Sequence, residues 1–129
     1  MANKKRGADA ERELLHLLSS RGFAVARVAG SGMIEETWCD LFAGNGKKKY
    51  AIEVKLSSNH KKYLDKEQIS GLVKFAEKFG LTPLIAIKFL RRGWWFVEPE
   101  KLENTEKALA ISFEDLQKKG KSFEEFVKL

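Results

Sequence analysis

Cysteine, histidine and proline are scarce in this chain, and long apolar runs are absent. Its 129 residues include one cysteine, two histidines and two prolines. The single Cys39 cannot form a disulfide within the chain, and one cysteine with two histidines is too few for a structural zinc site. No apolar run approaches the ~20 residues that span a membrane. We therefore expect a protein without a disulfide framework, structural zinc or a membrane partner.

Positive charge is in excess. The chain has 24 lysines and arginines against 18 acidic residues, a formal net charge of +6. This balance favours an anionic partner, most commonly nucleic acid, although many basic proteins are simply soluble. The basic residues 1–6 are not followed by the apolar core of a signal peptide. We therefore expect a cytoplasmic protein, associated with the nucleoid if DNA is its partner.

The order of periodic segments predicts one α/β domain over residues 1–129. Helices are expected at 9–21 and 65–79, and strands at 23–29, 38–43, 49–56, 84–90 and 94–97. The order α-β-β-β-α-β-β suggests a five-stranded mixed sheet flanked by helices. Residues 1–8 are expected to form a flexible basic arm, and residues 98–129 to contain short helices at 113–119 and 123–128.

A predicted hairpin brings two acidic residues together. Gly44-Asn45-Gly46 predicts a tight turn between the strands that carry Asp40 and Glu53. With a two-residue turn, Asp40 lies diagonal to Glu53; with a turn two residues longer, the two face each other directly. Both lengths place the carboxylates on one face of the sheet, because side chains alternate along a strand. A loop of odd length without a bulge would separate them.

A third acid and a backbone carbonyl complete a candidate metal site. Glu11 heads the apolar stripe of the first helix and should point toward the sheet; the alternative is a first-turn acid favoured by the helix dipole. Glu11, Asp40 and Glu53 offer oxygen ligands without histidine or thiol, which favours Mg²⁺, with Mn²⁺ as a substitute, over Zn²⁺. The carbonyl of Val54 can face the same ion. Such a cation would neutralise a phosphodiester and lower the pKa of bound water.

Lys55 shares the strand face of Glu53 and can serve the same chemistry. Its ammonium can orient or help deprotonate the attacking water and offset charge on phosphate oxygens. For Glu-Val-Lys alone, an exposed salt bridge between Glu53 and Lys55 is the better interpretation. Asp40, the turn and Glu11 together favour the catalytic interpretation.

Basic residues near these positions are candidates for DNA contact. Lys61 and Lys62 lie in a polar segment, expected to be a loop near the site, that either contacts a phosphate backbone or is merely solvated. Lys5 and Arg6 belong to the basic arm, which either follows phosphates or forms a disordered tail.

A family resemblance is carried by several segments in combination, over residues 3–97. They are Lys5-Arg6-Gly7-Ala8, Ala10-Glu11-Arg12-Glu13-Leu14-Leu15, Gly22-Phe23-Ala24-Val25, Ala29-Gly30-Ser31, Asp40-Leu41, Ala43-Gly44-Asn45-Gly46-Lys47-Lys48, Ile52-Glu53-Val54-Lys55, Phe75, Phe79-Gly80, Pro83, Ala86-Ile87-Lys88-Phe89-Leu90 and Gly93-Trp94. With them the sequence resembles the PD-(D/E)xK nuclease superfamily and, within it, the archaeal Holliday junction resolvases of the Hjc type.

This resemblance implies a restriction-endonuclease-like fold and a homodimer with an apolar interface and two active sites. It implies metal ligands and a catalytic lysine at the residues already singled out, Glu11, Asp40, Glu53 and Lys55. It adds Ser31 as a serine of a catalytic loop that also contacts DNA, and Arg12 and Arg27 as DNA-contacting arginines.

Three functional hypotheses follow. The leading one is a structure-selective, magnesium-dependent endodeoxyribonuclease that resolves four-way DNA junctions in recombination and repair. Recognition would rest on branch shape and phosphates, with no small-molecule substrate. The second keeps the fold but assigns forks, flaps or foreign DNA as substrate. The third is a non-catalytic module that binds branched DNA; the intact acids and lysine argue against it.

Overall fold

The computed structural model describes residues 2–28 and 38–129. Its elements in chain order are α1 (Ala2–Ser19), β1 (Ala24–Arg27), β2 (Leu41–Gly44), β3 (Lys49–Ser57), β4 (Lys61–Leu64), α2 (Lys66–Phe79), β5 (Thr82–Phe89), β6 (Gly93–Val97), the 3-10 helix η2 (Pro99–Lys101), β7 (Glu103–Asn104), β8 (Leu109–Ser112), α3 (Phe113–Lys119), β9 (Lys121–Ser122) and α4 (Phe123–Val127).

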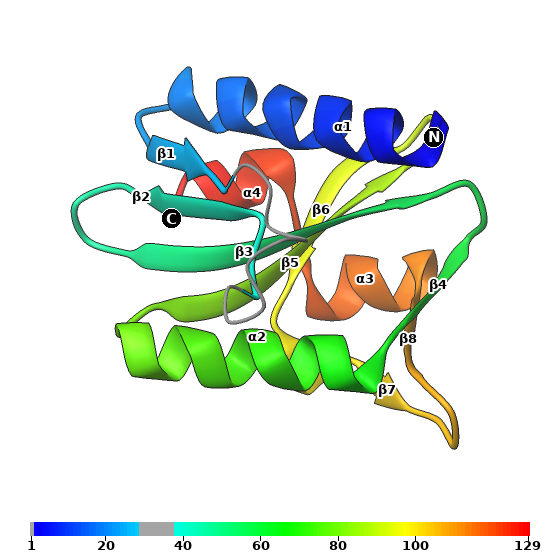
Figure 1. The fold of residues 1–129 in the computed structure, drawn as a ribbon. Helices are drawn as coiled ribbons and strands as arrows, with labels where there is room; N and C mark the ends of the chain where they lie inside the picture. Colours follow the sequence, from blue (N-terminus) through cyan, green and yellow to red (C-terminus); the bar gives the residue numbers. More distant parts are fainter. Residues whose placement is uncertain (1, 29–37) are drawn as a thin grey trace.

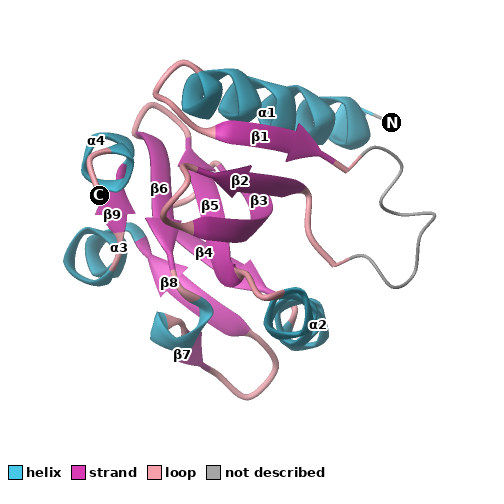
Figure 2. Cartoon of the chain, turned by 90° about the vertical axis from the view of Figure 1, so that its left-hand side faces the viewer, coloured by secondary structure: helices cyan, strands magenta, loops and turns pink. Residues whose placement is uncertain are grey.

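The central feature is a mixed sheet with strand order β1-β2-β3-β5-β6-β9. The pair β3–β5 is parallel and the other pairs are antiparallel. Helix α1 covers one face of this sheet and α2 covers the other (Figure 1). Figure 2 shows α3 and α4 together beside β9, apart from α2. The predicted mixed α/β sheet flanked by helices is confirmed.

Two expectations about strands were wrong. The main sheet has six strands rather than five, because the two-residue β9 adds to β6 and is too short to leave a periodic pattern. Residues 61–64 were expected in a loop but form β4, which pairs with β8 in a second sheet of order β4-β8-β7. That pairing joins segments far apart along the chain, so the local sequence pattern does not predict it.

The basic N-terminal segment is also different from the expectation. Helix α1 already begins at Ala2, so residues 2–8 are helical rather than a flexible arm. Alanine, lysine and arginine are strong helix formers, and they outweigh the single Gly7. Asp9, the first residue of the predicted helix, lies inside α1. Lys5 and Arg6 are therefore presented from a helix.

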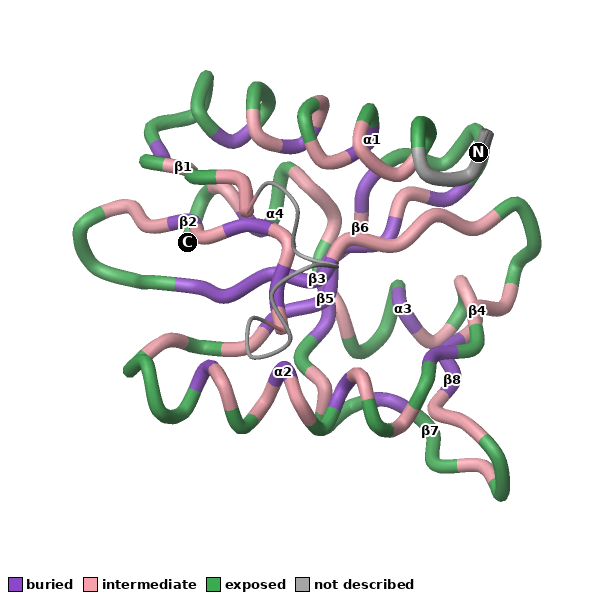
Figure 3. Tube along the Cα trace, viewed as in Figure 1, coloured by how far each residue is buried: buried purple, intermediate pink, exposed green. Residues whose placement is uncertain are grey.

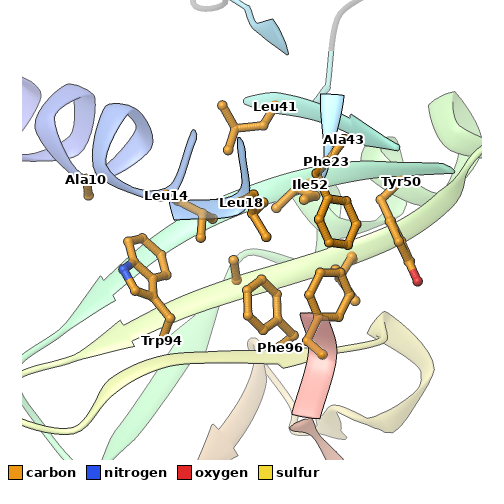
Figure 4. Close-up of a cluster of buried hydrophobic side chains, with 13 residues drawn as sticks. Ala10, Leu14, Leu18, Phe23, Leu41, Ala43, Tyr50, Ile52, Trp94 and Phe96 are labelled. Carbon is orange, nitrogen blue, oxygen red and sulfur yellow. The ribbon is translucent and has the colours of Figure 1, made fainter. Parts of the chain in front are cut away.

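The core consists of two clusters, one on each face of the main sheet. The α1 face includes Leu14, Leu18, Ile52 and Phe96, and Figure 4 shows them converging between the helix and the strands. The α2 face includes Ile69, Leu72, Ile85 and Ile87. Burial is concentrated on the central strands (Figure 3). Strand β3 lies between the two clusters, so any charged side chain at its middle is removed from water.

The C-terminal segment closes the α1-face cluster. Phe126 of α4 stacks on Phe96 with ring centroids 4.2 Å apart and contacts Tyr50 at 5.1 Å. Ser122 caps α4 through a capping box with Glu125. The two predicted short helices are confirmed within one residue, whereas β7, β8 and β9 were missed. No helix in the described part of the chain is long and apolar enough to cross a membrane.

Candidate active site

The β2–β3 hairpin brings the two predicted strand acids together. Gly44 pairs with Lys49 and Leu41 with Ile52, so the turn holds four residues rather than two. Asn45 explains the extra length, because its side chain accepts hydrogen bonds from the amides of Lys47 and Lys48. The longer of the two even turn lengths is therefore confirmed. The paired register ends at Leu41 and Ile52, and just before it the Asp40 amide donates to the carbonyl of the same Ile52, so Asp40 and Leu41 both lie opposite Ile52. The Asp40 side chain bonds the amide of Val54, the residue after Glu53, which brings its carboxylate beside Glu53.

Backbone bonds hold Asp40 just before β2. Its amide donates to the carbonyl of Ile52 at 2.8 Å, and its carbonyl accepts from the amide of Val28 at 2.9 Å. Its side-chain Oδ2 accepts from the amide of Val54 at 2.8 Å. The observed contact of Val54 with Asp40 is therefore made by the Val54 amide. The role of the Val54 carbonyl as a metal ligand stays a prediction. Asp40 is fixed at both its backbone and its carboxylate.

Asp40, which is half-buried, and Glu53, which is buried, form a carboxylate pair. Glu53 is 5% exposed, the only buried charged residue in the described part of the chain. Burial, followed by the charge of Asp40, raises the pKa of Glu53 to about 8. Burial also raises the pKa of Asp40, although the Val54 amide opposes this. The charge of Asp40 therefore acts directly on Glu53 inside the sheet.

Gln68 links the acid pair to the lysine, and the sequence analysis did not identify it. Its Nε2 donates to Oε2 of Glu53, and its Oε1 accepts from Nζ of Lys55, both at 2.8 Å. Lys55 Nζ also lies 3.3 Å from Glu53 Oε2. A sequence signal existed, because Gln68 heads the buried stripe of Leu72 and Ala76 at helical spacing, as Glu11 does on α1.

Glu11 approaches the pair without joining it. Its Oε1 accepts from Arg27 Nε at 2.8 Å, and the two side chains are only 17% and 22% exposed. Burial, then the charge of Asp40, raises the pKa of Glu11. Within residues 2–28 and 38–129, however, no three acidic, histidine or cysteine side chains gather into a metal-binding group. Glu11 comes from the helix on one face of the sheet, Glu53 is bound by the helix on the other, and both sense the charge of Asp40.

The predicted DNA-contacting residues fall into two groups. Lys62 lies beside the site: burial, then the charge of Lys55, lowers its pKa. Lys61 instead lies 3.9 Å from Glu103, and its ammonium group lies over the ring of Tyr63. The two lysines differ because they alternate along β4.

The arginines and the serine lie elsewhere. Arg12 is exposed and 3.7 Å from Asp9, and Arg27 holds Glu11. Lys5 and Arg6 are exposed on α1. Ser31 lies outside the described residues.

The acid pair has the chemistry of a divalent-cation site. Two carboxylates face each other in a largely apolar setting and can avoid mutual repulsion only by sharing a proton or a cation. Their hard oxygens suit Mg²⁺ or Mn²⁺. Lys55 supplies one positive charge nearby, and Asp40 also senses the more distant charge of Arg27. The residues present therefore fit the expected type of ion, with Glu11 as the third acid within electrostatic reach.

The fold and the acid–lysine group define an α/β protein of the restriction-endonuclease-like class. A family model described as archaeal Holliday junction resolvase (Hjc) matches residues 2–129. The solved structure of Hjc from Archaeoglobus fulgidus, described as a Holliday junction resolvase, superposes with a TM-score of 0.86 at 37% identity. That match covers 94% of this chain and 99% of the other.

Curated relatives agree with the structural match. Crossover junction endodeoxyribonuclease Hjc of Archaeoglobus fulgidus is 42% identical over 108 residues, covering 84% of this chain and 79% of the relative. The Hjc of Methanocaldococcus jannaschii is 38% identical over 126 residues, covering 91% and 90%. The chain belongs to the archaeal Holliday junction resolvase (Hjc) family.

Replacing Asp40 by asparagine should stabilise the metal-free protein. The amide Oδ1 can still accept from Val54, and its Nδ2 can donate to Glu53, so the buried repulsion disappears without loss of hydrogen bonds. We expect Asp40→Asn to raise the free energy of unfolding by about 1 kcal/mol in EDTA, measured by urea denaturation. Asp40→Ala, which leaves the Val54 amide without its acceptor, should be less stable than Asp40→Asn. Equal destabilisation of both variants would contradict the buried repulsion.

Proposed function

We propose that this chain is a structure-selective endodeoxyribonuclease that resolves four-way DNA junctions in recombination and repair. One observation carries the proposal: Asp40 lies beside the buried Glu53, next to a lysine fixed by Gln68, in a member of the Hjc family. Its relatives are named crossover junction endodeoxyribonucleases. The site of action would be the cytoplasm, in contact with the nucleoid.

The proposed cofactor is Mg²⁺, with Mn²⁺ as a substitute. Nucleases of this family generally depend on a divalent metal. Asp40 and Glu53 would hold the ion, with Glu11 and the carbonyl of Val54 as further ligands. When bound, the ion would neutralise the phosphodiester and lower the pKa of an attacking water.

The protein residues would then position and polarise the reactants. Lys55 is aimed by hydrogen bonding to Gln68, so its ammonium can orient the attacking water and offset charge on the phosphate oxygens. Water would attack in line, forming a new bond from its oxygen to phosphorus while the bond to the leaving oxygen breaks. No covalent enzyme intermediate is needed. Glu11 would release Arg27 on joining the ion, which frees that arginine for a phosphate.

DNA recognition would depend on branch shape and phosphates rather than base edges. The proposed contacts are Lys5, Arg6, Arg12, Arg27, Lys61, Lys62 and the loop serine Ser31. Lys62 and Arg27 have the strongest structural support, because both lie beside acids or the lysine of the site. Lys61 is already paired with Glu103 and would contribute less.

The direct test is a cleavage panel with purified protein. Wild type and Asp40→Asn are incubated with four-way, forked, flapped and linear duplex DNA, in Mg²⁺ and in EDTA. We expect wild type to cut the four-way junction preferentially and only with Mg²⁺. Asp40→Asn should reduce cleavage by about a hundredfold or more while still binding the junction in a gel-shift assay.

The same panel separates the alternatives. Preferential cutting of forks or flaps would support the second hypothesis, a nuclease with another branched substrate. Junction binding without cutting by the wild type would support the non-catalytic module. Unchanged cleavage by Asp40→Asn would place the chemistry elsewhere.

Gln68 should contribute to the rate because it aligns Lys55 with Glu53. Gln68→Leu removes both hydrogen bonds at similar volume. We expect the single-turnover cleavage rate to fall about 10- to 100-fold, the usual cost of removing an orienting partner in a metal site. Junction affinity should hardly change, because Gln68 is not a proposed DNA contact. The matched control is Gln117→Leu, an exposed glutamine on α3. A wild-type rate in Gln68→Leu would rule out the aligning role.

We further propose that the chain works as a homodimer through an aromatic surface. Phe42, Phe75 and Phe79 pack together, with Phe42 and Phe79 centroids 5.3 Å apart. Phe79 is nevertheless 62% exposed. A shallow apolar hollow of about 350 Å³ adjoins it, lined in part by Val25 and Leu81. A homodimer would present two sites with two-fold symmetry, which matches the approximate symmetry of a four-way junction.

Phe79→Glu should weaken this dimer. A charge at the centre of the aromatic surface would be desolvated on association, so we expect monomers at concentrations where wild type sediments as a dimer. Leu90→Glu is the control, because Leu90 is 63% exposed but lies on a different surface, between β5 and β6. Sedimentation velocity of wild type, Phe79→Glu and Leu90→Glu measures whether each protein is a monomer or a dimer. A dimeric Phe79→Glu, or a monomeric wild type, would reject this surface as the interface.

A further inference from the structure

A second basic feature lies away from the acid pair. It is a cavity of about 570 Å³, and it is lined by six lysines from separate segments of the chain. We call it the lysine cavity. Its lysines are Lys47, Lys48, Lys49, Lys101, Lys119 and Lys121. They are distinct from the residues of the candidate active site and from the DNA contacts proposed above.

These lysines form no ion pairs in the described part of the chain, although Lys101 acts electrostatically on Glu100 and Lys121 on Glu125. All six are exposed, and none makes a salt bridge or a side-chain hydrogen bond within residues 2–28 and 38–129. Other basic side chains, such as Arg21 and Lys88, are paired with glutamates. The contrast indicates that the charge of the cavity is left available for a ligand.

Few acids offset this charge. Among the described residues, Glu98 is the only acid that lines the cavity. Glu125 senses the charge of Lys121, but its carboxylate already accepts from the amide of Ser122. Six lysines and one glutamate give the lining a formal charge of +5, against +6 for the whole chain. An amount of charge close to the net charge of the protein is therefore gathered at one hollow.

The fold brings the cavity to one end of the sheet. Its lysines come from the β2–β3 turn and the start of β3, from η2, and from the segment that joins α3 to β9. In Figure 1 the β2–β3 turn projects from the end of the sheet opposite to the end at which β3 leads into β4. At about 3.3 Å per residue, Lys49 lies about 13 Å along β3 from Glu53.

We propose that the lysine cavity is a second binding site for the DNA backbone, which holds phosphates of a junction arm away from the point of cleavage. This inference rests on the proposed function. Lysines are hydrated point charges without a fixed geometry, and such charges suit a phosphate backbone whose sequence is not read. Six cations gathered from three segments of the chain exceed the needs of one phosphate. A separation of about 13 Å corresponds to about four base pairs of duplex.

The test is the salt dependence of junction binding, measured in EDTA so that no DNA is cut. The variant is Lys48→Gln/Lys101→Gln/Lys119→Gln, which removes one charge from each of three segments. The control is Lys107→Gln/Lys118→Gln/Lys128→Gln, three exposed lysines outside the cavity with the same reduction of net charge. Fluorescence anisotropy gives the dissociation constant at several salt concentrations for long-armed and short-armed junctions.

We expect the cavity variant to bind long-armed junctions about tenfold or more weakly at low salt. Its slope of log K against log salt should become shallower by about 2 to 3, because each phosphate that the protein neutralises contributes about 0.9 to the slope. The control should keep the wild-type slope, and the difference should vanish on short-armed junctions. Equal slopes for the two triple variants on long arms, or equal weakening on short and long arms, would overturn the proposal.

These outcomes are independent of cleavage. If the wild type fails to cut junctions in Mg²⁺, the proposed activity fails, but the slope difference still decides whether the cavity binds DNA. An intact fold is checked by circular dichroism and urea denaturation of both triple variants. Because every substituted lysine is exposed, unfolding midpoints close to wild type are expected. If a triple variant is destabilised, single substitutions at the same lysines give the slope for one lysine at a time.

Discussion

The structure depends on one unfavourable contact, the meeting of two carboxylates inside an apolar sheet. Asp40 and Glu53 face each other where β3 is buried between two hydrophobic clusters, and burial raises the pKa of both groups. A protein selected only for stability would place apolar residues here, because an unpaired buried charge is costly. Much of the surrounding arrangement reduces that cost or makes use of it.

Three neighbours hold the pair in place without neutralising it fully. The Val54 amide binds Asp40, Gln68 binds Glu53, and Lys55 adds one positive charge that Gln68 also orients. Toward the α1 face of the sheet, Arg27 donates a hydrogen bond to Glu11 and keeps that carboxylate close to the pair. The proposed cation site would be largely preorganised, because Asp40 and Glu53 are fixed before an ion arrives and only Glu11 would have to leave its partner. The burial imposed by the fold, the raised pKa values and the proposed chemistry therefore all concern the same two carboxylates.

Much of this could be predicted from the sequence because local signals are strong where the site lies. Strand alternation set the shared face of Asp40 and Glu53, and only the turn length was open, since the Asn45 side-chain bonds were not visible in the pattern. Gln68 was missed because its partners are thirteen and fifteen residues away and meet it only through tertiary packing. The pairing of β4 with β8 was missed for the same reason. The single-domain organisation of residues 1–129 and the catalytic roles stay predictions.

The central claim is that Asp40 and Glu53 share one divalent cation. The most direct measurement is a crystal structure of the protein grown with Mn²⁺, with the ion located by its anomalous scattering. The account predicts a peak between the two carboxylates, with oxygen distances of about 2.0 to 2.3 Å and Glu11 detached from Arg27. A carboxylate pair without an ion between its oxygens, while Mn²⁺ occupies another part of the molecule, would contradict it.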